Sequence, residues 1–554
     1  MSDLVLNDPA RSAVLDAAHL GDIEGALGTI YQGDTKHRRT WRARLATLFA
    51  IVGPGLIVMI GDNDAGAFGT YTQAGQNYGT ALLWTLLLLV PVLYVNQEMV
   101  LRLGVVTGVG HARLILERFG KFWGAFSVID LFILNGLTIV TEFIGINLAL
   151  GYLGVPRAWG ILVAAGVVIG AASTGSFRRF ERFSLALCLF SLLLVPIFLM
   201  AHPPLAAVGR DLVVPRFPAG AKLSDVMLLV IAIVGTTVAP WQLFFQQSYV
   251  IDKRITPRFM AYEKADLVIG IGAVLVGAVA MMAFAAAAFQ GTPGFGQFTD
   301  AGAVAKGLET YAGRAAGVMF ALALMDASVI GASAVSLATA YAIGDVLALR
   351  HSLHRKATDA RGFYAVYAGL IAVAAALVLF GSDALLGLLT NAVQTLAGVL
   401  LPSATVFLLL LCNDRAVLGP WVNGRWLNLF TGAVIWVLVM LSVILTVAAV
   451  FPGITGGTIL TVLGGGSALG VAGFAAVSVL RAGRGEQATA AGPALQPQLR
   501  AMRATWRMPP LDALPAPNLS LSKRVWMGLL RAYLVAAVIL VAIKVVQLAM
   551  MASM

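Results

Sequence analysis

The chain has 554 residues, of which 59% are hydrophobic and only 12% are charged. Soluble domains carry about 25% charged residues, so this chain lacks the charge to cover a water-facing surface of its size. The composition excludes a soluble enzyme, a disordered chain and a secreted disulfide scaffold, and predicts a multi-pass protein of the lipid bilayer, in the cell inner membrane. The net charge of +11 is typical of membrane proteins, which gather Lys and Arg in cytoplasmic loops, so we expect no nucleic-acid partner.

Apolar runs long enough to cross a bilayer as a helix, roughly 20 residues, recur along the whole chain. The thirteen candidates lie at 46–74, 80–101, 122–153, 157–174, 182–201, 224–250, 265–289, 314–349, 361–381, 384–411, 427–451, 457–480 and 525–551. The run at 457–480 is the weakest, because its glycines lower its helix propensity. Basic residues precede the first run and fill every second loop, which predicts a cytoplasmic N-terminus.

Two of these runs are interrupted by residues that a continuous helix avoids. The first contains Gly53-Pro54-Gly55 and then Gly61-Asp62-Asn63-Asp64, and the sixth contains the stretch from Gly235 to Pro240. Such breaks leave backbone groups that lipid cannot satisfy, so they must be buried in protein or line a wet cavity. Matched breaks five spans apart indicate an inverted-repeat transporter. The alternative is that Gly and Pro are simply common in membrane helices.

The breaks and loop charges predict an all-α membrane protein with two inverted repeats of five helices, broken helices 1 and 6, and two or three further C-terminal helices. The expected segments are a cytoplasmic N-terminal segment (1–45), a first repeat (46–201), an extracytoplasmic loop (202–223), a second repeat (224–412), helices 11 and 12 (413–480), a cytoplasmic linker (481–524) and a C-terminal membrane helix (525–554).

Carboxylates inside the apolar runs are candidate functional groups, because a charge at the bilayer centre costs ~2.5–3.5 kcal/mol on insertion scales. Asp64, beside unwound backbone carbonyls, predicts an all-oxygen cradle for a cation. Asp62 in the same break belongs either to this site or to the cap of the following half-helix.

The other intramembrane carboxylates have several interpretations. Glu98 is close to Arg102, which favours a structural ion pair over a ligand. Asp130 and Glu142 are either proton-relay groups or buried partners of polar groups. Asp326 has no Lys or Arg near it in the sequence, so it lies either near the permeating cation or in a protonated state.

Several segments resemble motifs of the NRAMP divalent-metal transporters. Residues 64–70, Asp-Ala-Gly-Ala-Phe-Gly-Thr, resemble the family's first-helix Asp-Pro-Gly-Asn motif, and residues 97–108 resemble its second helix and following loop. Residues 142–145 match a third-helix segment, and Gln394 falls where the tenth helix of the family has a site glutamine. The resemblance covers about residues 53–414, and it implies a LeuT-type fold with a divalent metal as substrate and no cofactor.

The chain departs from the family's pattern at two ligand positions. Ala67 stands where the first-helix motif ends in an amide ligand, and Ala239-Pro240-Trp241 stands where the sixth helix reads Met-Pro-His. A thioether favours transition metals over hard ions, so its loss, with the opened volume, suits a largely hydrated Mg²⁺. The sequence therefore looks like the NRAMP-related magnesium transporter branch.

The resemblance implies a metal site formed by Asp64, Gly61, Ala67, Gly235, Val238, Ala239 and Gln394. The gating or relay candidates are Asp62, Glu142, Trp241, Gln242, Asp326 and Asp130.

We expect uptake of a hard divalent cation by alternating access, with Mg²⁺ as the main substrate and Mn²⁺ also carried. Trp241 replaces a histidine of the family's proton path, which predicts transport without protons, since 100 mV supplies about 4.6 kcal/mol to a divalent ion. The alternative is a proton-coupled Mn²⁺/Fe²⁺ symporter of the NRAMP type, and a cation channel or sensor is a more distant alternative.

Two other classes are disfavoured. Asp64 would repel an amino-acid carboxylate, which argues against an amino-acid symporter, and the apolar runs contain no nucleophile–base pair that would indicate an enzyme. A monomer is favoured, although the oligomeric state is open.

Overall fold

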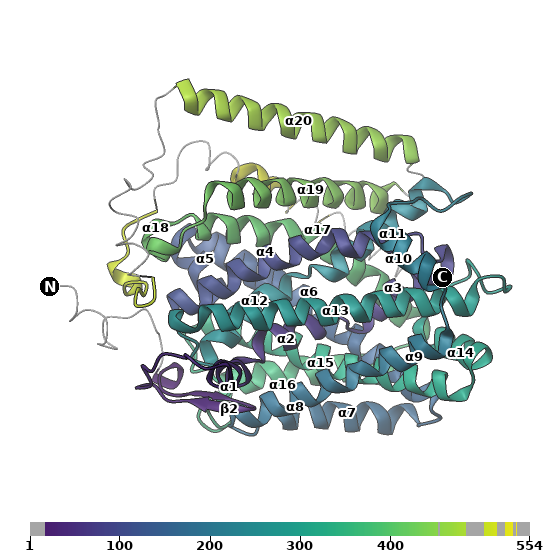
Figure 1. Ribbon diagram of the computed structural model, residues 1–554, viewed down its shortest axis with the longest axis horizontal. Helices are drawn as coiled ribbons and strands as arrows, with labels where there is room; N and C mark the ends of the chain where they lie inside the picture. Colours follow the sequence, from purple (N-terminus) through teal and green to yellow (C-terminus); the bar gives the residue numbers. More distant parts are fainter. Residues whose placement is uncertain are drawn as a thin grey trace.

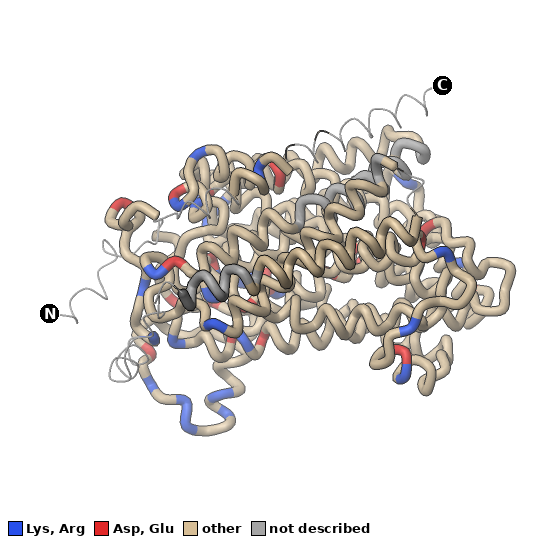
Figure 2. Tube along the Cα trace, turned by 90° about the horizontal axis from the view of Figure 1, so that it is seen from above, with Lys and Arg blue, Asp and Glu red and all other residues tan. Residues whose placement is uncertain are grey.

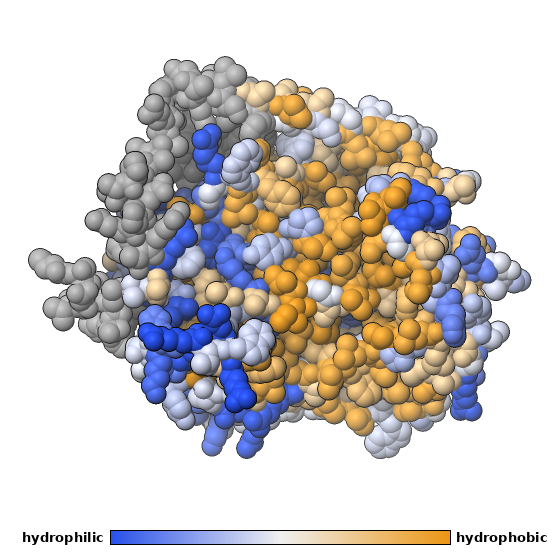
Figure 3. Space-filling view, viewed as in Figure 1, coloured by the Kyte–Doolittle hydropathy of each residue, from blue (hydrophilic) through white to orange (hydrophobic). Residues whose placement is uncertain are grey.

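The computed structural model describes residues 17–451, 455–483, 503–517 and 527–533, with Val535 and Ile539. These parts of the chain are mainly helical, and the long helices lie side by side with roughly parallel axes (Figure 1). Apolar side chains cover the middle of the molecule, whereas hydrophilic ones gather toward its two ends (Figure 3). A central apolar band of this kind is the surface that a bilayer requires.

Among the described residues, nine helices are long and apolar enough to cross a membrane, or ten when a bent pair counts as one. The bent pair is α1 (Trp41–Ile51) with α2 (Pro54–Ile60). The other spans fall in α4 (Trp84–Thr107), α6 (Lys121–Tyr152), α8 with α9 (Phe177–Phe190 and Leu194–Ala201), α11 with α12 (Leu223–Thr237 and Pro240–Asp252), α13 (Met260–Phe289), α15 (Arg314–Val346), α16 (Arg361–Phe380), α19 (Arg425–Val450) and α20 (Gly456–Gly483).

Three of the thirteen predicted runs do not appear among these spans. The run at 157–174 forms α7 (Arg157–Ala172), which at 16 residues is just short of a full crossing. The run at 384–411 forms the long helix α17 (Asp383–Cys412), whose side chains the structure describes only in part. Most of the run at 525–551 lies outside the described residues.

Both predicted breaks are present. The first run is broken twice, because α1 and α2 meet at a bend of 54° and a second break of four residues, 61–64, separates α2 from α3 (Ala65–Tyr78). In the sixth run α11 ends at Thr237 and α12 begins at Pro240. Pro54 and Pro240 each occupy the first turn of a half-helix, where the missing proline N–H leaves no helical bond unmade.

Close packing of helices around the first run depends on small residues. A Cβ atom on Gly55 of α2 would lie 2.6 Å from the backbone nitrogen of Leu267 in α13. A Cβ atom on Gly75 of α3 would overlap the carbonyl of Met282, which also belongs to α13. Helices in lipid associate through such close backbone contacts. The two half-helices α2 and α3 are thereby seated along α13, while α6 packs along α15.

The N-terminal segment contains a small sheet that the sequence analysis did not predict. A turn of 3-10 helix, η2 (Ala17–His19), precedes an antiparallel hairpin of β1 (Ile23–Gly25) and β2 (Gly28–Ile30). The hairpin packs against α1 and the start of α8, and in Figure 1 it lies at the end of the bundle where the described chain begins. The remaining elements are α5 (His111–Phe119), η3 (Ser191–Leu193), α10 (Leu205–Val213), η4 (Pro257–Phe259), α14 (Ala301–Ala312), α18 (Arg415–Leu418), η5 (Gly419–Trp421) and η6 (Leu511–Ala513).

Candidate functional site

A cavity lies between the break that precedes α3 and the break between α11 and α12, with α6 and α17 completing its wall. It holds about 430 Å³ of empty space, open solvent included. Its lining residues are Asp64, Gly66, Leu134, Thr138, Thr141, Glu142, Gly235, Thr236, Ala239, Pro240, Trp241, Val393 and Ala397. Both broken spans therefore contribute to one cavity, which is the arrangement that matched breaks predict.

Asp64 sits at the start of the half-helix α3 and is the N-cap of that helix. Its Oδ1 accepts a hydrogen bond from the backbone N–H of Ala67 at 2.9 Å, which also places the carboxylate at the positive end of the helix dipole. The sequence analysis left open that Asp62 caps this half-helix, and the structure gives the cap to Asp64. Ala67 contributes its backbone to the site, while its side chain is outside the cavity lining.

Glu142 of α6 faces Asp64 across the cavity. Both carboxyl groups line the cavity, and Glu142 Oε2 accepts from the backbone N–H of Ala65, the residue after Asp64, at 3.1 Å. Glu142 Oε1 is buried and has no hydrogen-bond partner in the part of the chain that the structure describes. Two neighbouring buried carboxyl groups repel each other when both are charged, so this pair is suited to hold either a proton or a cation.

Gly331 of α15 closes the far side of this carboxyl pair. A Cβ atom there would lie 2.8 Å from Glu142 Cδ and 3.1 Å from Asp64 Cβ, distances that side-chain carbons do not tolerate without displacement. The absence of a side chain on Gly331 thus allows α3, α6 and α15 to bring the two acids together.

Hydroxyl groups extend the polar wall along α6. Thr138 Oγ1 donates to the carbonyl of Leu134 at 2.9 Å, and Thr141 Oγ1 donates to the carbonyl of Leu137 at 3.2 Å. Each hydroxyl hydrogen is thus used within the helix, which leaves oxygen lone pairs for a cation or its water shell. The sequence analysis missed both threonines, although Thr138 lies three residues before Thr141 and four before Glu142, spacings that share a helical face.

The second break contributes backbone groups and the indole ring of Trp241 to the cavity wall. Gly235, Ala239 and Trp241 line the cavity, whereas Val238 is the C-cap of α11 and bonds through its N–H to Val234 O at 3.1 Å. The Trp241 ring is buried, and the position that a Cβ on Gly61 would occupy lies 3.6 Å from it.

Gln394 was expected to contribute from α17. Its neighbours Val393 and Ala397 line the cavity, while the side chain of Gln394 is outside the described residues.

Asp62 belongs to a separate buried network next to the cavity. Gln242 Nε2 donates to Asp62 Oδ1 and, at 3.3 Å, to Thr237 O, and Gln97 Nε2 donates to Gln242 Oε1 at 2.8 Å. This chain of amides joins α4, the first break and α12. Asp62 and Gln242 therefore tie the two broken spans together, and neither lines the cavity.

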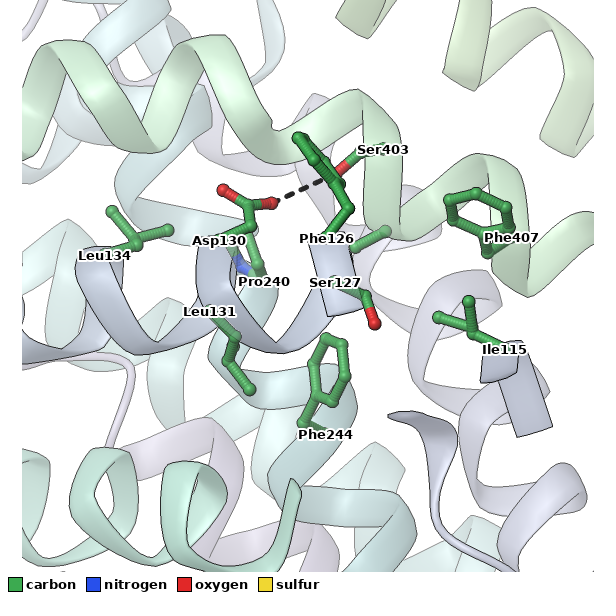
Figure 4. Close-up of a pocket in the computed structure, with 11 residues that line it drawn as sticks. Ile115, Phe126, Ser127, Asp130, Leu131, Leu134, Pro240, Phe244, Ser403 and Phe407 are labelled. Carbon is green, nitrogen blue, oxygen red and sulfur yellow. Dashed lines mark hydrogen bonds between the residues drawn. The ribbon is translucent and has the colours of Figure 1, made fainter. Parts of the chain in front are cut away.

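A second cavity continues from the first, with Leu134 and Pro240 shared between them. Its wall is apolar except for Asp130, Ser127 and Ser403, and the Ser403 hydroxyl donates to Asp130 Oδ2 at 3.4 Å (Figure 4). Asp130 Oδ1 has no partner among the described residues. Asp130 and Glu142 thus line two adjoining cavities along α6.

Two other acids have structural partners. Asp326 accepts from the Ser191 hydroxyl at 2.9 Å and lines neither of these two cavities. Glu98 is paired with Arg102 at 3.3 Å and with Lys264 at 2.7 Å, which confirms the predicted ion pair.

Comparison with known proteins shows that one protein family matches most of the chain. The model of the family described as "Natural resistance-associated macrophage protein-like" matches residues 55–448. A "Divalent metal cation transporter MntH" of Burkholderia ambifaria is 29% identical over 449 residues, covering 78% of this chain and 95% of that protein. The protein of the same name from Ralstonia nicotianae is 30% identical over 410 residues, covering 71% and 88%.

Among solved structures, the manganese transporter of Eremococcus coleocola superposes with a TM-score of 0.59 at 19% identity, covering 82% of this chain and 96% of that chain. At this identity the likeness concerns the fold. It confirms the predicted LeuT-type arrangement of helices.

Proposed function

Because the chain belongs to the NRAMP family of divalent metal transporters, we propose that it takes up hard divalent cations, with Mn²⁺ carried and Mg²⁺ admitted at the same site. The sequence analysis favoured Mg²⁺ without proton coupling. The names of the relatives specify divalent metals and manganese, so the comparisons support the manganese alternative better than a preference for Mg²⁺.

The lining of the cavity between the breaks carries this proposal. Its described side chains offer carboxylate and hydroxyl oxygens from Asp64, Glu142, Thr138, Thr141 and Thr236, together with backbone groups, and they include neither sulfur nor imidazole. Carboxylate, carbonyl and water ligands suit Mg²⁺ and Mn²⁺ alike. A cavity of this chemistry distinguishes the two ions weakly.

The contact between Asp64 and Glu142 favours a second feature, coupling to protons, over the uncoupled transport expected from the sequence. A cation that binds Asp64 competes with a proton held by either of the two neighbouring carboxyl groups, so such a proton moves to Glu142 or leaves. Asp130 precedes Glu142 by 12 residues, about 18 Å along a helix, and stands in the adjoining cavity. We assign it as the proton acceptor on the exit side, in place of the imidazole that Trp241 cannot supply.

The orientation follows from the charges. Lys and Arg gather at the end of the molecule where the described chain begins (Figure 2), and the positive-inside rule assigns such an end to the cytoplasm. The second cavity, which contains Asp130 and borders α5 and the end of α17, then lies on the cytoplasmic side of Asp64, in the inner membrane of a bacterial cell.

Competition in proteoliposomes tests the proposed substrates. Mn²⁺ uptake should saturate, excess Mg²⁺ should inhibit it, and Asp64→Ala should abolish it. Uptake that Cd²⁺ inhibits and excess Mg²⁺ leaves untouched would contradict an oxygen-only site. A pH-sensitive dye inside the same vesicles reads the coupling, and metal uptake without proton entry would remove the role assigned to Glu142.

A further inference from the structure

Residues 503–517, here called the C-terminal segment, follow the stretch of the chain that the family model matches, 55–448. They lie beside α18 at one end of the bundle (Figure 1, yellow). Prolines are frequent in this segment, at positions 509, 510, 515 and 517. Because proline fixes the backbone φ angle, a segment of this composition is stiff and loses little conformational entropy when it docks.

The C-terminal segment completes the end of α4. Arg507 donates to the carbonyl of Val105 at 2.8 Å, and the backbone N–H of Met508 donates to the carbonyl of Val106 at 3.2 Å. Carbonyls in the last turn of a helix have no partner within that helix, and a cation beside them is favourable. The side chain of Met508 is fully buried at this contact, so hydrogen bonds and apolar packing act together as one anchor.

A second anchor lies on the turn η5. Trp421 Nε1 donates to the carbonyl of Arg503 at 3.0 Å, and the Arg503 guanidinium lies 5.2 Å from the centre of the Trp421 ring. The ring of Trp506 lies so close to Gly419 that a Cβ atom there would overlap it. Gly419 has a φ of +49°, which glycine adopts without steric cost. The turn is thus shaped to receive the tryptophan.

A third contact reaches two helices that border the second cavity. Arg118 of α5 donates to the carbonyl of Pro515 at 2.6 Å and forms an ion pair of 2.5 Å with Asp414, which follows α17. Ile115 of α5 and Phe407 of α17 line the second cavity. The C-terminal segment is therefore bonded to the same arginine that joins two walls of this cavity.

Aromatic rings pack tightly where these walls meet. The ring of Phe407 lies 5.2 Å from that of Phe119 and 4.9 Å from that of Trp123, measured between ring centres. Phe119 directly follows Arg118 in the chain. Figure 4 shows Phe407 and Ile115 at the end of the cavity opposite Leu134, and Leu134 borders the metal cavity. The end of the second cavity remote from the metal is thus closed by α5 and α17.

We propose that the C-terminal segment is a strap that holds α5 against α17 and keeps this remote end of the second cavity closed, and that undocking the strap opens it. Within 503–517 only Met508 is buried, and segments with few buried apolar contacts open at the lowest free-energy cost. The inference rests on the proposed function in one respect, because the strap regulates proton exit from Asp130 only in a proton-coupled transporter.

A thiol on the cavity wall measures its accessibility. Ser127→Cys in a Cys188→Ala, Cys412→Ala background of the full chain leaves one cysteine, and its reaction with a charged methanethiosulfonate is timed in purified protein without metal. Met508→Asp places a charge at the buried anchor and should raise the reaction rate about tenfold. Ala513→Asp adds the same charge at an exposed position of the segment and should leave the rate unchanged.

Hydrogen exchange shows whether the strap has undocked. In Met508→Asp, and in Trp506→Ala, which removes the ring from Gly419, the amides of 503–517 should exchange faster than in the wild type. Unchanged exchange or unchanged thiol reactivity in both variants would overturn the strap. Because neither readout needs metal or protons, faster exchange and faster thiol reaction in a protein that carries no Mn²⁺ would support the strap while refuting the proposed function.

Discussion

At the scale of single residues, we propose that Ala239 governs which metals the site can hold. It lines the cavity at the second break, in the position where the family's motif has methionine. Introducing a thioether there adds a soft ligand that favours transition metals.

Ala239→Met should therefore lower the Cd²⁺ concentration that half-inhibits Mn²⁺ uptake about tenfold, the equivalent of ~1.4 kcal/mol of binding free energy. Ala239→Leu fills the same space without sulfur and controls for bulk. Competition curves in proteoliposomes measure the effect, and equal Cd²⁺ inhibition in the Met and Leu variants would refute this explanation of the site.

Glu142 is the second residue with a specific expectation. A glutamine there donates an amide hydrogen to Asp64 at any pH, so it imitates the protonated acid permanently. Glu142→Gln should lower Mn²⁺ uptake by about tenfold or more and flatten its dependence on pH, a loss typical of removing a positioned acid–base group. Glu309→Gln on α14 makes the same chemical change far from the cavity and should retain the wild-type pH profile. A wild-type profile in Glu142→Gln would show that Asp64 alone handles the proton.

At the scale of elements, the approach of α15 to the carboxyl pair sets the geometry of the site. Gly331→Ala should place a methyl group 2.8 Å from Glu142 Cδ and separate the two acids. Such a displacement near reacting groups commonly costs about 10²-fold in rate, with little loss of folded protein. Gly136→Ala on α6 has nothing within 4 Å of the added Cβ and should leave transport unchanged. Initial uptake rates at matched protein amounts compare the two variants.

The elements also show how far the sequence alone leads. The apolar runs, the two breaks and the presence of Asp64 and Glu142 inside the apolar region could all be predicted, because each is expressed in local composition or in a charge that lipid does not tolerate. The contact between Asp64 and Glu142 joins residues 78 positions apart, and the hairpin's bonds to Glu181 span 155. No local pattern records such pairings, since they depend on how whole helices pack.

Asp62 shows that the roles of neighbouring residues are equally hard to predict from the sequence, here within the four-residue break 61–64. Asp62 and Asp64 are equivalent in composition and both lie in the first break, yet one binds Gln242 and the other caps α3. Which acid faces the cavity depends on where α2 ends and α3 begins, and glycine-rich sequence does not specify that boundary.

At the scale of the whole molecule, a loop outside the spans makes stability depend on pH. His351 lies 3.1 Å from Asp345 Oδ1 in the segment between α15 and α16. Burial lowers the pKa of His351, but the charge of Asp345 and hydrogen bonds to Asp345 and to the Leu349 carbonyl outweigh burial and raise the pKa to about 9.

Because this pKa is raised above that of the unfolded chain, the stabilisation is complete below pH ~6.5 and is lost as pH rises through about 9. The free energy of unfolding should fall by on the order of 1–3 kcal/mol across this pH range. Thermal unfolding across this range should show a declining midpoint in the wild type and a smaller decline in His351→Gln. Identical slopes would mean that the imidazole does not gain its proton on folding.

The position and ligands of bound Mn²⁺ test the central claim most directly. A crystal of the protein soaked in Mn²⁺, with anomalous diffraction recorded at the manganese edge, locates the metal and its neighbours. The account predicts a peak between the two breaks, against the Asp64 carboxylate, with oxygen atoms of protein or water as its only neighbours. A peak ligated by sulfur or by a ring nitrogen, or one seated away from Asp64, would contradict it.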